Sequence, residues 1–157
     1  MAKPESPAED LASVLRTTKN RLAYLSHNDW KLIIDKAKRV RFSKSETLIQ
    51  QGKQNKVVYL LAKGKVNIDV SRSKVAQIGP GEVCGEMAFL ENSLASATAI
   101  AEEETEAYAI EWPALESLFE LFPHLASRFY RSLAVNLSRR LREQITSQKS
   151  TPQKSNK

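Results

Sequence analysis

GEMAFLENSLASATA, at residues 85–99, is the stretch on which the interpretation of this chain depends. It begins with a Gly-Glu pair before a short helical segment and ends in a run of small and hydroxyl-bearing residues. Glycine allows close approach of the backbone, and the N–H groups that follow it can face an anion. The spacing is typical of a phosphate cradle. Two groups of residues would form it: Gly85, Glu86, Met87 and Ala88, and then Ala95, Ser96 and Ala97.

Strongly acidic sequence surrounds this cradle. Residues 75–122 carry ten glutamates and no lysine or arginine. An anionic ligand normally meets a cation in its site, and a basic side chain from elsewhere in the chain could partly compensate for its absence here. Lys53 and Lys56, in the turn after Gly52, are the candidates that we consider.

The region from residue 39 to residue 112 consists of short apolar runs separated by turn residues. All five glycines of the chain lie within it, and glycine is favourable in turns that need a positive φ. Together these features predict an antiparallel β-roll. Strands are expected at residues 40–42, 47–49, 57–62, 65–70, 75–78, 97–101 and 106–110.

Helical periodicity flanks this region on both sides. Ser26 and Asp29 have the spacing of a capping box at the start of one of these helices. One domain is expected at residues 8–147, between a disordered N-terminus at 1–7 and a disordered basic tail at 148–157. Helices are expected at residues 8–25, 27–38, 113–121 and 123–147.

Large apolar residues recur every four positions along the last predicted helix. They are Leu125, Phe129, Leu133, Leu137, Leu141 and Ile145. An α-helix turns every 3.6 residues, so each step advances about 40° and the whole stripe winds through about 200°. The first half is expected to pack on the β-roll, while the second half needs another cover. We expect Leu137, Leu141 and Ile145 to form an interface with a second subunit; the alternative is that the N-terminal helices fold back over them.

The formal net charge of +6 is unevenly distributed along the chain. Residues 1–74 carry 16 basic and 7 acidic side chains, and residues 123–157 carry 8 basic side chains and 1 acidic one. Two interpretations are open. Either faces of opposite charge attract one another within the molecule, or the basic segments form a binding surface.

Several functional classes are disfavoured by composition. The single cysteine excludes a disulfide framework, and no metal-ligand spacing is present. No apolar run approaches the ~18 residues of a membrane helix, and the polar N-terminus has no secretory signal. No nucleophile–base constellation marks a catalytic site. We therefore expect a cytoplasmic protein that is not an enzyme, with no catalytic residues and no metal.

Several motifs carry a resemblance to a known family. GPGEVCGEMAFL, ASAT and EEETEAYAIEW, in this order, resemble the phosphate-binding cassette and the following hairpin of the cyclic nucleotide-binding domain family, of the catabolite activator protein and kinase A regulatory subunit type. RVRFSKSETLIQQGKQNKVVYLLAKGKVNI resembles its first strands, whose two fixed glycines are here Gly52 and Gly64. FPHLASRFYRSLAVNLSRRLRE resembles the long helix that closes the ligand pocket. The resemblance covers about residues 26–146.

This resemblance implies an α+β fold, with a jelly-roll type β-roll, N-terminal helices and a long C-terminal helix. It also implies that Glu86 accepts hydrogen bonds from a ribose hydroxyl and that Ser96 is a hydroxyl donor. Two positions depart from the family pattern: Cys84 replaces a phenylalanine, and Ala95 replaces the arginine that pairs with the cyclic phosphate. Losing two charge-assisted hydrogen bonds, each worth roughly 1.5–3 kcal/mol, predicts weak or absent binding of cyclic AMP.

The resulting hypothesis is a regulatory module that binds a cyclic nucleotide or another small anion. It would signal through its C-terminal helix to a protein partner or to a second subunit in a homodimer. The alternative is a degenerate protein-interaction module with no small-molecule ligand. Specific DNA binding is not expected, because the chain ends about ten residues after the last predicted helix. Nonspecific contacts of the basic tail with nucleic acid rank third.

Overall fold

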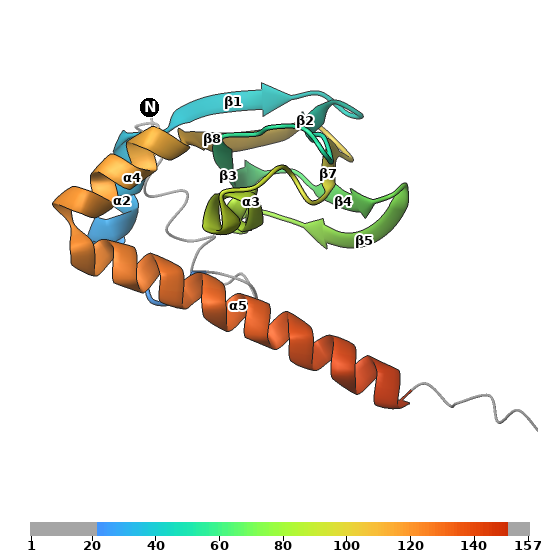
Figure 1. Cartoon of the computed structure of the whole chain (residues 1–157). Coiled ribbons are helices and arrows are strands. Elements are labelled where there is room, and N and C mark those ends of the chain that lie inside the picture. The colour runs from blue at the N-terminus through green and yellow to red at the C-terminus, as the bar shows by residue number, and fades with distance from the viewer. Residues whose placement is uncertain (1–21, 151–157) are drawn as a thin grey trace, which may run out of the picture.

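The computed structural model describes residues 22–150 of the 157-residue chain, in which eight antiparallel strands form two four-stranded sheets (Figure 1). The strand order is β1-β8-β3-β6 in one sheet and β2-β7-β4-β5 in the other. Together the sheets make the expected β-roll. The strands are β1 (Lys38–Phe42), β2 (Thr47–Ile49), β3 (Val57–Lys63), β4 (Val66–Val70), β5 (Ser73–Ile78), β6 (Val83–Cys84), β7 (Thr98–Ala101) and β8 (Thr105–Glu111).

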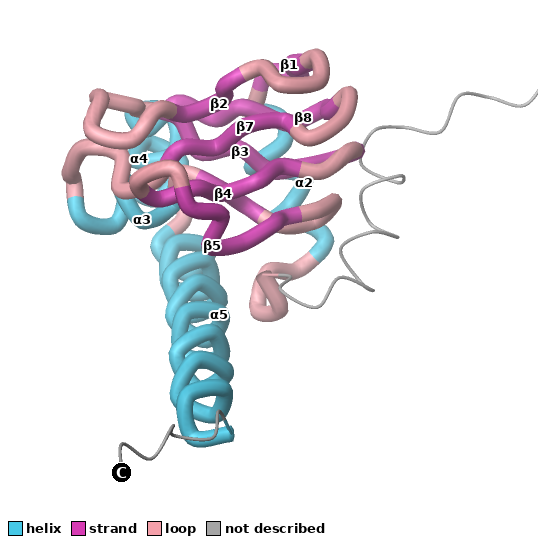
Figure 2. Tube along the Cα trace, turned by 90° about the vertical axis from the view of Figure 1, so that its right-hand side faces the viewer, coloured by secondary structure: helices cyan, strands magenta, loops and turns pink. Residues whose placement is uncertain are grey.

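Within residues 22–150, four helices accompany the roll. They are α2 (His27–Asp35), α3 (Glu86–Glu91), α4 (Trp112–Leu121) and α5 (Pro123–Ser150). Helices α2 and α4 lie together at one end of the roll, and α5 runs along it and then continues beyond it (Figures 1 and 2). None of the helices within the described residues is long and apolar enough to cross a membrane.

Strand β3 separates two hydrophobic clusters. Because side chains alternate along a strand, Val58 and Leu60 face the cluster that includes α2, α4 and α5, while Leu61 faces the cluster inside the roll. All three of these side chains are buried. The helices are thus attached to one face of one sheet, and the interior of the roll is a separate core.

The turn between β3 and β4 requires the glycine at position 64. Gly64 has a φ of +97°, and a Cβ atom there would lie 2.5 Å from Thr105 Oγ1 and 2.7 Å from the carbonyl oxygen of Glu104. Both the dihedral angle and the close packing exclude a side chain. The clustering of glycines in this region therefore indicated turns correctly.

Ion pairs join distant parts of the sequence, and those of Glu106 join the acidic segment to a basic one. Glu106 is buried between Arg39 and Arg41 of β1, and the hydrogen bonds from these arginines lower its pKa to about 2. Asp29 of α2 accepts hydrogen bonds from Arg128 of α5 at 2.7 Å and 2.8 Å. Part of the charge asymmetry is therefore neutralised within the molecule, as the first of our two interpretations predicted.

The predicted elements agree with the structure except at a few places. All seven predicted strands are present, but the two-residue strand β6 was missed. The second predicted helix, 27–38, ends already at Asp35, because Lys38–Phe42 pairs with β8. The capping box of Ser26 and Asp29 is confirmed.

The predicted N-terminal helix, 8–25, is wrong at residues 22–25, which form a turn, and its remainder lies outside the described residues. The predicted termini, 1–7 and most of 148–157, also lie outside them. Helix α5 continues to Ser150, three residues beyond its predicted end.

The two halves of α5 have different surroundings. In the first half Leu125, Phe129 and Leu133 are buried in the helix-facing cluster, as predicted. In the second half Leu141 is 59% exposed and Ile145 is 44% exposed. The stripe of apolar residues therefore leaves the core as it winds around the helix.

Candidate functional site

A cavity of about 790 Å³ lies between the roll and the second half of α5. Its size is within the range of pockets that hold small ligands. Strands β4 and β5, the segments around residues 83–88 and 95–99, and α5 all contribute to its walls. All seven residues predicted to form the phosphate cradle line it: Gly85, Glu86, Met87, Ala88, Ala95, Ser96 and Ala97.

Gly85 places the first cradle segment against strand β3. It has a φ of +88° and precedes the short helix α3. A Cβ atom at this position would lie 2.7 Å from the carbonyl oxygen of Val57, which also accepts a 2.7 Å hydrogen bond from Asn55 Nδ2. Only glycine fits here, so local packing by itself requires Gly85.

The Glu86 side chain is buried at the base of the cavity, with 8% of the residue exposed. Burial raises the pKa of its carboxyl group, and the charge of Glu82 acts in the same direction. A hydrogen bond with its own backbone and the charge of Arg140 oppose this rise in pKa. Glu86 is therefore a buried acceptor, and the charge of Arg140 is one of the two influences that favour its ionised form.

The second cradle segment is held by backbone hydrogen bonds to the turn at residues 52–53. Gly52 N donates to the carbonyl oxygen of Ala95 at 2.8 Å, and Ala95 N donates to the carbonyl oxygen of Lys53 at 3.0 Å. The Ala95 side chain is buried and Ser96 is exposed. The position where the family pattern has arginine thus faces the cavity but carries only a methyl group.

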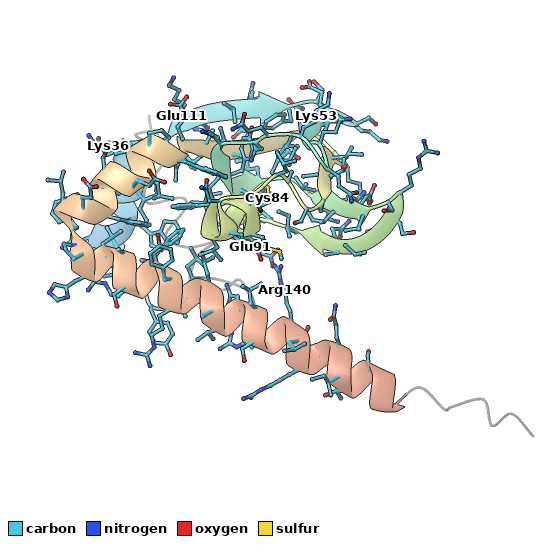
Figure 3. The ribbon with its side chains drawn as sticks, in the orientation of Figure 1. Lys36, Lys53, Cys84, Glu91, Glu111 and Arg140 are labelled. Carbon is cyan, nitrogen blue, oxygen red and sulfur yellow. The ribbon has the colours of Figure 1, made fainter. Side chains whose placement is uncertain are left out.

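Neither of the lysines considered as compensating cations reaches the cavity. Lys53 and Lys56 are both exposed, and neither is among the described residues that line it. Figure 3 shows Lys53 on the opposite side of the roll from α5. The turn supports the site through its backbone and not through its charges.

Arg140 is the basic residue that sequence analysis did not identify. It is the single basic residue among the described residues that line the cavity, and its side chain rises from α5 toward α3 (Figure 3). Arg140 lies three residues after Leu137 and therefore on nearly the same helix face. This spacing was the signal in the sequence that could have identified it. That signal was missed because we assigned this face to a subunit interface.

Two of the three predicted interface residues belong to the cavity wall. Leu137 and Leu141 line it, together with Glu143, Gln144 and Ser147 of the same helix, whereas Ile145 does not. Leu141 and Ile145 remain largely exposed. The interface with a second subunit stays a prediction, and any such interface would lie next to the cavity.

Cys84 lies at the wall of the cavity and is buried. Burial raises the pKa of its thiol far above the usual range, with a smaller contribution from the charge of Glu86. The thiol is therefore protonated, and it behaves as a small apolar side chain in the core of the roll.

Comparisons with known proteins identify similar sequences. The family model for the cyclic nucleotide-binding domain matches residues 39–121. Cyclic GMP-binding protein C of Dictyostelium discoideum is 29% identical over 156 residues, which cover 91% of this chain and 6% of that protein. Cyclic AMP receptor protein of Thermus thermophilus is 34% identical over 107 residues, which cover 65% of this chain and 48% of that protein. The chain thus spans less than half the length of either relative.

Solved structures show the same fold. The crystal structure of Thermus thermophilus catabolite activator protein matches with a TM-score of 0.67 and 30% identity, over 80% of this chain and 59% of that one. A cyclic nucleotide-binding domain from Methylobacillus flagellatus matches with a TM-score of 0.74 and 20% identity, over 87% of this chain and 79% of that one. The second likeness concerns the fold alone.

Proposed function

The chain belongs to the cyclic nucleotide-binding domain family, and from this premise we propose that it is a regulatory module that binds a cyclic nucleotide or a similar small anion between the β-roll and α5. The observation that carries the proposal is the cavity itself. It is of suitable volume, and all seven cradle residues line it. Its apolar walls, including Ile49, Ile68 and Ile78, suit a nucleobase, and its polar end at Glu86 suits a ribose.

Affinity for cyclic AMP should be low compared with relatives that have the cassette arginine. Ala95 lines the cavity without supplying charge or hydrogen-bond donors from its side chain. The loss of two charge-assisted hydrogen bonds corresponds to a reduction on the order of a hundred- to several-thousand-fold. Any cation in the cavity that meets the ligand would reduce this loss.

The signal would leave through the second half of α5. This segment lines the cavity but contributes no fully buried residue among those described, so its position is sensitive to what the cavity contains. Leu141 and Ile145 are available to a protein partner or to a second copy of the chain. In this proposal the protein is cytoplasmic and has no catalytic role.

Calorimetric titration of the full chain with cyclic AMP, cyclic GMP and cyclic dinucleotides tests the proposal. We expect saturable binding of at least one of them, with a dissociation constant for cyclic AMP between about 10 µM and 10 mM. Glu86→Gln, which keeps the size of the side chain, should weaken binding of the preferred nucleotide. Failure of every nucleotide to bind at about 10 mM would favour the interaction-only module.

A further inference from the structure

We propose that Arg140 binds the phosphate group of the ligand, so that the cation missing from the cassette at position 95 is supplied by the closing helix α5. The inference rests on the proposed function, because it identifies a binding residue of the same cavity. It goes beyond that function by assigning the phosphate contact to an element that the family's cassette pattern does not include.

The placement of Arg140 is the first argument. Ala95 and Arg140 both line the cavity, one from the roll and the other from α5. Arg140 is partly buried, whereas its neighbours Arg139 and Arg142 are exposed and do not line the cavity. The second half of α5 therefore carries three arginines, of which one enters the site.

The charges around Arg140 are the second argument. Glu86 and Glu143 line the same cavity, and the charge of Glu82 acts on the Glu86 carboxyl group. A guanidinium group has five N–H donors in a planar arrangement, so it can face Glu86 with one edge and a phosphate with another. Arg140 can therefore hold a cyclic phosphate beside a carboxylate that would otherwise repel it.

The location on α5 gives this contact a consequence for signalling. Arg140 lies one helical turn beyond Asn136, the last fully buried residue of α5 among those described. A ligand that binds Arg140 is therefore bound to the unanchored half of the helix. Such a ligand has different affinities for two positions of α5, which is the requirement for shifting the helix. Some of the binding free energy is used to hold the helix, so the affinity is lower than with a cation on the roll.

The test compares Arg140→Ala and Arg140→Lys with Arg139→Ala, an adjacent arginine that does not line the cavity. Protein-observed NMR titrations of the full chain would use cyclic AMP and adenosine, which share base and ribose, to about 10 mM. For wild type we expect tighter binding of cyclic AMP than of adenosine. Arg140→Ala should lower cyclic AMP affinity by about 10- to 100-fold and leave adenosine unchanged. Arg140→Lys should lie between, and Arg139→Ala should match wild type.

Three other outcomes would overturn the inference. Equal cyclic AMP affinity in Arg140→Ala and Arg139→Ala overturns the inference while the proposed function stands. A parallel loss of adenosine binding also overturns it, because Arg140 would then act by shaping the cavity. If wild type binds neither these compounds nor any other cyclic nucleotide, the proposed function fails and the inference fails with it. Circular dichroism of each variant checks that the helices are intact.

Discussion

The two halves of α5 have the same apolar repeat but opposite structural roles. Residues 123–136 are held by buried Leu125, Phe129 and Leu133 and by the ion pair of Arg128 with Asp29. A hydrogen bond from Tyr24 N to Ser132 Oγ, 3.0 Å long, adds a further attachment. Residues 137–147 include no fully buried side chain. A regular repeat can therefore give one helix a buried half and an exposed half, because the repeat and the helical turn do not match.

Truncating one leucine in each half should give the largest difference. Leu133 is 2% exposed and Leu141 is 59% exposed. We expect Leu133→Ala to lower the free energy of unfolding by about 2–5 kcal/mol, because it leaves a cavity in the core. Leu141→Ala should change it by less than about 0.5 kcal/mol. Urea unfolding of monomeric protein at low concentration measures both, and equal losses would contradict the division of α5 into two halves.

A measurement of self-association tests whether a second copy of the chain covers the second half of α5. If a second copy packs on Leu141 and Ile145, wild type should sediment as a dimer at about 10–50 µM. Leu141→Lys should weaken that dimer by at least about 100-fold, since a charge would be buried at the interface. Thr146→Lys, on another face of the helix, is the matched control. A monomeric wild type at these concentrations would count against an interface with a second copy of the chain.

Adding a second cation to the cavity, on the roll opposite α5, tests the two sides of the cavity against each other. In Ala95→Arg the buried methyl group is replaced by a guanidinium group at the cavity wall. Cyclic AMP affinity should rise by about 10- to 100-fold, and binding should become less dependent on Arg140. Ala95→Met controls for the added bulk. No gain in Ala95→Arg, with the fold intact, would argue that the cavity does not accept a cyclic phosphate.

The fourth prediction, with the smallest expected effect, concerns acid. Low pH should weaken the attachment of the anchored half of α5, residues 123–136. The hydrogen bond from Arg128 holds the pKa of the Asp29 carboxyl below its usual value of 3.8, although burial opposes this. Since the folded-state pKa is the lower one, the pair adds stability above about pH 3.8 and loses it as the pH falls through the folded-state value.

Asp29→Asn should therefore lower stability at neutral pH and reduce its dependence on pH below 3.8. Urea titrations across this range measure the change. Glu106→Gln provides a comparison, because its ion pairs lie on β1 and β8 and leave α5 untouched. If both variants loosened α5 equally, the Asp29–Arg128 pair would not be a specific anchor.

Much of the site could be predicted from local sequence. Gly85 was predictable because a Gly-Glu pair before a short helical segment allows close backbone approach. Its positive φ and tight packing in the structure are consistent with this. The small residues at 95–97 were predictable by their spacing from it. Strand β6 was missed because two residues carry too little periodicity, and only its pairing with Tyr59 and Leu60 makes it a strand. Lys53 was considered as a cation of the turn after Gly52, but its backbone, and not its side chain, contacts the cradle.

The sequence by itself determined the family, the β-roll and the absence of a cation from the cassette, because these depend on residue type and spacing along one segment. It also determined that the apolar stripe of α5 must leave the core, since that follows from 3.6 residues per turn. Only the tertiary structure decided which basic side chain enters the cavity. Arg140 is 54 residues from Glu86 in the chain, and its approach depends on how the first half of α5 is anchored on the roll. Three-dimensional packing, and not local spacing, sets such long-range proximity of charges.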